Sequence, residues 1–176
     1  MTHYTQALKL TRTKEAVFAA VFTALAVYMP MLIHYFGGVD AGRKFLPMPF
    51  FVLAAGLLLG WRAGLVTGLV SPIVSFLISG MPMAAILPFM TVQLCAYGLV
   101  SGLLKIRYGT LFSLAGGIAS GLAVSGIVIF LFSKMNAAGY VLSSVKDGWI
   151  GIAIQLLLLP LILFLLQKYL SDEKNI

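Results

Sequence analysis

The stretch "GGVDAGRKFLPMPFFVLAAGLLLGWRAG", residues 37–64, places a charged, glycine-rich segment directly before an unbroken apolar run. Asp40, Arg43 and Lys44 stand beside two prolines, and the apolar run ends at a tryptophan followed by an arginine. A tryptophan beside a cation is a normal marker of a membrane boundary. The stretch therefore predicts a polar loop, then a short membrane span, then a tight turn at the opposite face.

The composition of the whole chain agrees with this interpretation. Hydrophobic residues make up 61% of the 176 residues, charged residues make up only 10%, and the mean hydropathy is +1.04. Because a soluble domain carries about 25% charged residues, this chain cannot cover itself with a water-compatible surface. The net charge of +7 is spread over short connections and forms no basic stripe, so we expect no nucleic-acid partner.

Crossing a bilayer core takes about 20 apolar residues per helix. By that measure the sequence predicts an all-α integral membrane protein, with residues 1–176 forming a single six-helix domain. The predicted spans are residues 15–35, 46–61, 63–79, 84–104, 109–133 and 143–168.

The lysines and arginines predict the orientation of these spans. If the N-terminus is inside, eight of the 12 lie on inner segments and four on outer ones. The positive-inside rule then places the N- and C-termini in the cytoplasm. We expect a multi-pass protein of the cell membrane, in a bacterium the plasma membrane, with membrane lipid as its surroundings.

The first span carries a stripe of small residues, Ala16, Ala20 and Ala24, at a spacing of four. In lipid no hydrophobic force drives helices together, so close approach depends on small residues that let the backbones touch. Two interpretations stay open at this point. The stripe either packs against the protein's own helices or forms a docking face for another membrane protein.

Polar and aromatic residues gather at the predicted outer ends of the spans. Phe89, Gln93 and Tyr97 share one face of the fourth span. A side-chain amide left unpaired in hydrocarbon costs about 2–7 kcal/mol, so Gln93 and Gln155 must each face a partner or a cavity. The full set of candidate ligand-binding residues is His34, Arg43, Phe45, Ser75, Phe89, Gln93, Tyr97, Asn136, Trp149 and Gln155.

Several of these residues also have an ordinary structural explanation. Serines in membrane helices often donate to their own backbone carbonyls, so Ser75 is explained by packing as readily as by ligand contact. Trp149 and the nearby Tyr140 suit the aromatic belt of a membrane interface. His34 suits a capping or headgroup position, and Arg43 a solvated one.

Some kinds of chemistry are not expected of this chain. It has no phosphate-binding loop of the Walker type, so we do not expect it to hydrolyse ATP. No acidic residue falls deep inside a predicted span, which disfavours a self-sufficient ion-driven carrier. His3, His34 and Cys95 lack the spacing of metal ligands. The sequence therefore predicts neither an enzyme nor a cofactor or metal site, but a small binding subunit.

The chain resembles, over nearly its whole length, the substrate-binding S components of energy-coupling factor transporters. That group includes the riboflavin, folate, pantothenate and hydroxymethylpyrimidine proteins. The resemblance lies in the length, the six spans, the alanine stripe and "FLPMPFFVLAAGLLLGWRAGLVTGLVSPIVSFLISGMP", residues 45–82. In that stretch a turn from Gly60 to Gly64 leads into a span that contains serine and proline.

The resemblance implies a function and partners. An S component binds a vitamin or related heterocyclic micronutrient from outside. It then docks, through the alanine stripe of its first helix, on a transmembrane T component carried by two cytoplasmic ATPases. The first outer loop, here residues 36–46, would act as a lid. The alternative is a stand-alone small carrier or channel for a small metabolite.

Overall fold

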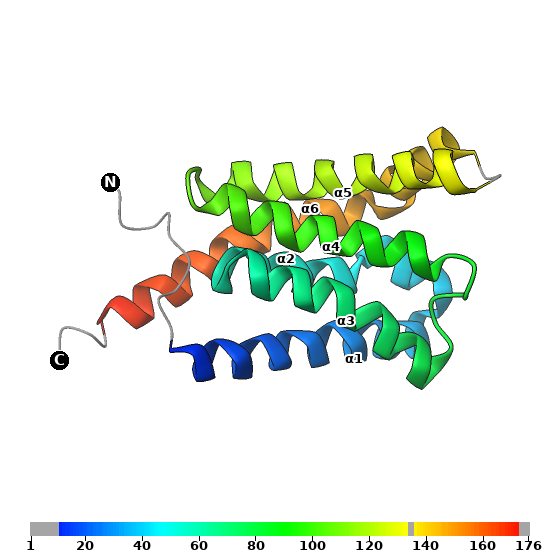
Figure 1. Ribbon diagram of the computed structural model, residues 1–176. Coiled ribbons are helices and arrows are strands. Elements are labelled where there is room, and N and C mark those ends of the chain that lie inside the picture. Colours follow the sequence, from blue (N-terminus) through cyan, green and yellow to red (C-terminus); the bar gives the residue numbers. More distant parts are fainter. Residues whose placement is uncertain (1–10, 134–135, 173–176) are drawn as a thin grey trace.

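The computed structural model describes residues 11–133 and 136–172, with the backbone alone for Val39 and residues 166–172. The described chain forms a bundle of six α-helices that run up and down side by side (Figure 1). The end where α1 begins is called the near end below, and the opposite end the far end. The helices are α1 Arg12–Phe45, α2 Pro47–Leu59, α3 Trp61–Ser79, α4 Leu87–Lys105, α5 Thr110–Phe132 and α6 Ala137–Asp172.

In the described chain six helical segments are long and apolar enough to cross a membrane, which confirms the all-α, six-span, multi-pass prediction. The predicted and observed bounds agree closely for the first, third, fourth and fifth spans. The second and sixth spans begin earlier than predicted. The observed segments are Arg12–Gly38, Asp40–Leu59, Trp61–Ser79, Leu87–Lys105, Thr110–Phe132 and Ala137–Leu165.

The predicted loop over residues 36–46 is wrong, because this segment is helical on both sides of a break at Gly38. The reason is length. α2 has 13 residues, which at 1.5 Å per residue is about 20 Å, too short for a hydrocarbon core of about 30 Å. The helical turns from Asp40 onward supply the missing length, so Asp40–Leu59 is the segment that is long and apolar enough to cross a membrane.

Two residues break the helix in this region. Gly38 has φ 70° and ψ −174°, a conformation that side chains rarely adopt. Leu46 is left-handed with φ 47° and ψ 52°, and the ring of Pro47 disfavours continuation of the right-handed helix at this residue. Pro47 then opens α2 at its first turn, where the missing N–H needs no partner.

The sixth helix begins at Ala137, six residues before the predicted start at residue 143. The side-chain oxygen of Asn136 accepts a hydrogen bond of 3.0 Å from the N–H of Gly139, which is the geometry of an N-cap. This cap extends the helix toward the far end. Lys146 and Asp147 lie on an exposed face of this helix.

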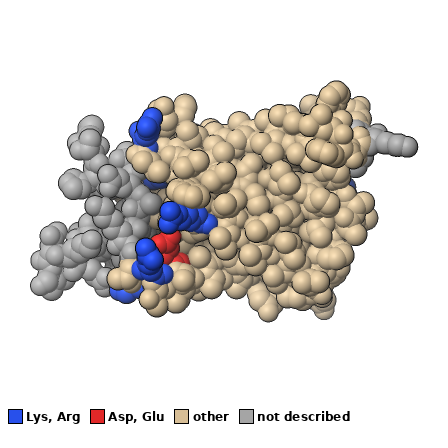
Figure 2. Space-filling view, viewed as in Figure 1, with Lys and Arg blue, Asp and Glu red and all other residues tan. Residues whose placement is uncertain are grey.

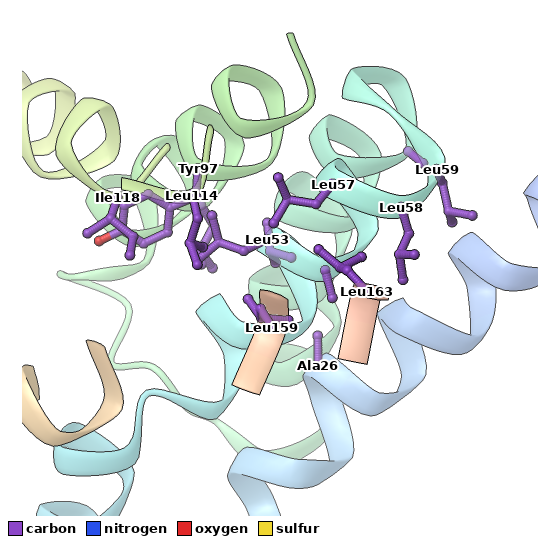
Figure 3. Packing of buried hydrophobic residues seen from close by; sticks show 14 of the residues in the cluster. Ala26, Leu53, Leu57, Leu58, Leu59, Tyr97, Leu114, Ile118, Leu159 and Leu163 are labelled. Atoms are coloured by element: carbon purple, nitrogen blue, oxygen red, sulfur yellow. The ribbon is translucent and has the colours of Figure 1, made fainter. Parts of the chain in front are cut away.

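The apolar core is centred on α2. Every residue from 52 to 59 is buried, as expected for a helix that is hydrophobic on all sides. Leu53 and Leu57 point toward α4 and α5, where Tyr97 and Leu114 contribute to the same cluster (Figure 3). Leu159 and Leu163 of α6 enter the cluster from another side. α2 therefore makes its contacts with protein rather than with lipid.

Glycines allow α2, α3 and α4 to meet at one point. A Cβ at Gly98 of α4 would overlap the backbone of Gly64 in α3, and a Cβ at Gly56 of α2 would overlap the Gly98 carbonyl. One turn further along α3, Gly68 faces the Leu94 carbonyl in the same way. Helix contact through small residues is the usual means of association in lipid, and here it brings the backbones themselves together.

The charged residues of the described chain are unevenly distributed. On the face shown in Figure 2, Lys and Arg gather at the near end. In chain order, the described cations at helix termini and turns of the near end are Arg12, Lys14, Arg62, Lys105 and Arg107, and those of the far end are Arg43, Lys44 and Lys146. Lys9, Lys134, Lys168 and Lys174, which also entered the orientation prediction, lie outside the described side chains.

Gly98→Ala should lower the free energy of unfolding by about 1–3 kcal/mol, the usual cost of overpacking. An alanine normally stabilises a helix interior relative to glycine, so a loss would report the tight contact with Gly64. The measurement is denaturant unfolding in detergent micelles. Gly109→Ala is the control, because nothing lies within 4 Å of a Cβ at that position. Equal stability of the two variants would contradict the close α3–α4 contact.

Candidate functional site

Three polar side chains form a hydrogen-bonded network between α4 and α6. The Gln93 side-chain N–H₂ donates to the Tyr97 hydroxyl oxygen at 2.6 Å. The Tyr140 hydroxyl of α6 donates to the Gln93 side-chain oxygen at 3.2 Å. Gln93 therefore uses both ends of its amide, and the structure places Gln93 and Tyr97 on one face of α4.

The surrounding helices fix the position of this network. Tyr97 is 5% exposed, and its ring lies against Gly121 of α5, where any larger residue would collide with it. In the described chain α6 packs on α5, α1 and α2 but not directly on α4. Tyr140 and Gln93 consequently span a space between two helices whose backbones stay apart.

A second polar contact joins α6 to the break between α1 and α2. Gln155 is 1% exposed, and its side-chain N–H₂ donates to the Leu46 carbonyl oxygen at 3.3 Å. One and two turns earlier on the same face, Gly151 lies against the backbone of Phe45 and Gly148 against the side chain of Leu46. The requirement that Gln155 face a partner is thus met by a backbone carbonyl.

His34 and Arg43 lie near this junction in different surroundings. The imidazole of His34 is covered by Gly42, where a Cβ would collide with the ring. Its Nδ1 is buried and makes no hydrogen bond within the described structure. Arg43 is exposed, and the Phe45 side chain is 45% exposed. Among these predicted residues only His34 presents a buried polar atom.

The remaining predicted ligand-binding residues take part in neither of these hydrogen-bonded contacts. Ser75 is buried on α3, and Phe89 is half-buried one turn before Gln93 on the same face of α4. Trp149 is 62% exposed, consistent with an interfacial belt position. Asn136 caps α6, so its side-chain oxygen already has a structural partner.

The predicted residues therefore form two groups instead of converging on one pocket. Tyr140 and Gln155 are 15 residues apart on α6, about 22 Å along the helix axis. The groove at the far end, of about 610 Å³, is apolar and lies between α5 and α6. It is lined by Leu122, Ala123, Gly126, Ile127, Phe130, Leu131, Ala137, Ala138 and Val141. We take the Gln93–Tyr97–Tyr140 network as the candidate ligand site.

The alanine stripe of α1 faces outward. Ala16, Ala20 and Ala24 are all exposed, so within the described helices they do not serve internal packing. A neighbouring pair of small residues makes the internal contact instead. Ala19 packs on the core cluster, and the Thr23 hydroxyl lies 3.4 Å from the hydroxyl of Thr67 in α3.

Sequence reasoning missed two residues of this structure. Tyr140 was interpreted as a belt residue, and no local signal indicates a partner 47 residues away. Lys105 was counted among the inner cations, yet it is 1% exposed and donates to the Thr110 hydroxyl across the α4–α5 turn. Lys105 and Thr110 are five residues apart on either side of a turn, and this spacing was the sequence signal that could have predicted their hydrogen bond.

The described residues contain no group of three or more His, Cys, Asp or Glu side chains that could hold a metal ion. Comparison with known proteins gave no match to a family model, to a curated protein or to a solved structure. The function is therefore inferred from this chain's own residues and their geometry.

Asn136→Ala should lower the free energy of unfolding by about 1 kcal/mol, the usual effect of losing an N-cap, and should leave ligand affinity unchanged. Asn136→Asp should keep most of the stability, because aspartate also accepts the Gly139 N–H. Thermal unfolding in detergent measures the first effect and ligand titration the second. A loss of affinity in both variants at wild-type stability would restore Asn136 as a ligand contact.

Proposed function

We propose that this chain is the membrane-embedded substrate-binding subunit, the S component, of an energy-coupling factor importer. Its ligand is a vitamin or related heterocyclic micronutrient taken from outside the cell. Its partners are a transmembrane T component and two cytoplasmic ATPase subunits. Both termini lie in the cytoplasm, so the far end of the bundle faces outward and the near end faces the ATPases.

The observation that carries the proposal is the outward position of the alanine stripe. Ala16, Ala20 and Ala24 are exposed on a helix whose other small residues, Ala19 and Thr23, already make the internal contacts. A smooth row of small side chains gives a second helix close access to the backbone. Docking of the T component on this face of α1 gives the stripe a role that internal packing does not.

The polar network suits a flat, uncharged part of a ligand. Gln93 and Tyr140 offer amide and hydroxyl groups, which match the donor and acceptor edges of a heterocycle. The buried ring of Tyr97 offers an aromatic surface beside them. A ligand that replaces the Tyr140–Gln93 hydrogen bond with its own would fit the space between α4 and α6.

The acidic side chains of the described chain fit a subunit whose energy comes from elsewhere. Asp40 and Asp147 are exposed, and Glu15 is half-exposed in the first turn of α1. Ion-driven carriers usually keep ionisable groups buried at membrane depth. This placement supports coupling to ATP hydrolysis in partner subunits.

The experiment that tests the proposal is purification of the protein from its native membrane, followed by mass spectrometry of what leaves with it. We expect a heterocyclic small molecule together with a T component and ATPases. Purified protein that carries no small molecule would contradict the binding role. Uptake by vesicles that contain this chain and no ATPase would instead indicate a stand-alone carrier.

Ala20→Trp should abolish ATP-dependent uptake while ligand affinity stays within about twofold of wild type, because the bulky ring blocks docking outside the ligand site. Phe130→Trp is the matched control, since Phe130 is 77% exposed on α5 and should tolerate the change in both assays. Uptake into proteoliposomes with the complete transporter and ligand titration of the isolated chain give the two readouts. Loss of ligand binding in Ala20→Trp would show that the stripe supports the fold.

A further inference from the structure

The far ends of α5 and α6 lie side by side (Figure 1), and the apolar groove described above runs between them. Its volume is about 610 Å³, and every residue that lines it is apolar. Gly126 of α5 and Val141 of α6 meet within it, since a Cβ at Gly126 would lie 3.0 Å from the Val141 side chain. The two helices therefore touch at the floor of the groove, and the groove follows the outside of this contact, where Ala123 and Ala138 are exposed.

Large apolar side chains of α5 stand along the groove. Ile127, Phe130 and Leu131 line it and are 58%, 77% and 63% exposed. Helices associate in lipid through small residues that let the two backbones approach closely. Because these three side chains would keep a second helix away from the floor at Gly126, the groove suits an occupant that is narrower than a helix.

The groove is continuous with the surface that these two spans present to lipid. All its lining residues belong to Thr110–Phe132 and Ala137–Leu165, which are long and apolar enough to cross a membrane. On α5 the lining residues run from Leu122 to Leu131, a distance of about 14 Å along the helix axis. That length is close to half of a hydrocarbon core of about 30 Å, so the groove is about as long as one leaflet of the bilayer is deep.

The lining of the groove selects hydrocarbon as its occupant. An ordered water molecule needs about two to four polar partners, and the lining side chains offer none. An empty groove would leave these side chains without the dispersion contacts that close packing provides. A flexible hydrocarbon chain restores those contacts, and in a bilayer that hydrocarbon is supplied by the acyl chains of phospholipids.

We propose that the α5–α6 groove binds one acyl chain of a membrane phospholipid, in the leaflet at the far end. The chain lies along α5 between Leu131 and Leu122, and its headgroup is level with the end of α5 at Phe132. Its affinity comes from packing between the walls of the groove, because bulk lipid is as apolar as the groove itself.

The bound chain lies behind the polar network. Gly121 of α5 packs on the Tyr97 ring, and the Tyr140 hydroxyl of α6 donates to Gln93. Gly121 and Tyr140 each directly precede a residue that lines the groove, Leu122 and Val141. An acyl chain in the groove therefore stabilises the pair of helices on which the network depends. The inference rests on the groove alone and does not require the proposed function.

The test is photo-crosslinking of the full chain in phosphatidylcholine nanodiscs that contain a trace of phosphatidylcholine with a diazirine in one acyl chain. Attachment sites are mapped by proteolysis and mass spectrometry. Attachment at Ile127 and Phe130 should exceed several-fold that at Leu77 and Ile78, which are exposed at the far end of α3 and lie outside the groove. Equal attachment on the two faces would mean that the groove contacts only bulk lipid, and the proposal would be overturned.

A matched pair of variants checks the site itself. Ala123→Phe fills the groove with a ring and should lower attachment at Ile127 and Phe130 to the level of the α3 residues. Ala119→Phe should leave attachment unchanged, because Ala119 is exposed one turn earlier on α5 and does not line the groove. Gel filtration verifies that both variants fold.

Undiminished attachment in folded Ala123→Phe overturns the acyl-chain site. Attachment in the wild type below the level of the α3 residues, together with dimers on gel filtration, also overturns it and assigns the groove to a second copy of the chain. If Ala123→Phe does not fold, the comparison of the two faces in the wild type decides alone.

Discussion

The fold depends on a steric constraint at one point, where the backbones of α2, α3 and α4 touch through Gly56, Gly64 and Gly98. In lipid, dispersion contacts and hydrogen bonds must replace the hydrophobic force that packs helices in water. Dispersion attraction falls off quickly with distance, so removal of three side chains is what makes the contact effective. Once these helices meet, α2 is enclosed, and the remaining helices pack around an established centre.

The number of spans, which depends on neighbouring residues, could be predicted from the sequence, whereas contacts between residues far apart in the chain were missed. Hydropathy along the chain predicts the number of spans, because each must meet the bilayer by itself. The helical turns from Asp40 were missed, because polarity at Arg43 and Lys44 suggested a loop, whereas span length required a helix. The α6 partner of Gln93 and the backbone partner of Gln155 lie 47 and 109 residues away, and no spacing rule reaches that far. The glycine at position 64 was interpreted as part of a turn, although its packing role is the larger one.

Two kinds of contact hold the helices together, and they occur in different parts of the bundle. Apolar and glycine contacts hold α2, α3, α4 and α5 together, and they are insensitive to any small polar molecule. The far half of α6, residues 137–155, packs through Val141, Gly148 and Gly151, and it adds hydrogen bonds from Tyr140 to Gln93 and from Gln155 to the Leu46 carbonyl. α1 has a third role, since its inward face packs on α3 through Thr23 while its alanines remain outside. In the proposed function, ligand binding, coupling and structural stability would use different faces of the bundle.

The enclosure of α2 bears on how the chain is made. α2 is synthesised before α3 to α6, yet two of the residues that cover it, Leu159 and Leu163, belong to α6 and follow it late in the described chain. Until α6 is inserted, the surface that α2 will bury against protein must rest against lipid or an insertion factor. The core of the bundle therefore cannot be completed before α6 is inserted, and a chain that stops before residue 159 has an incomplete core at its centre.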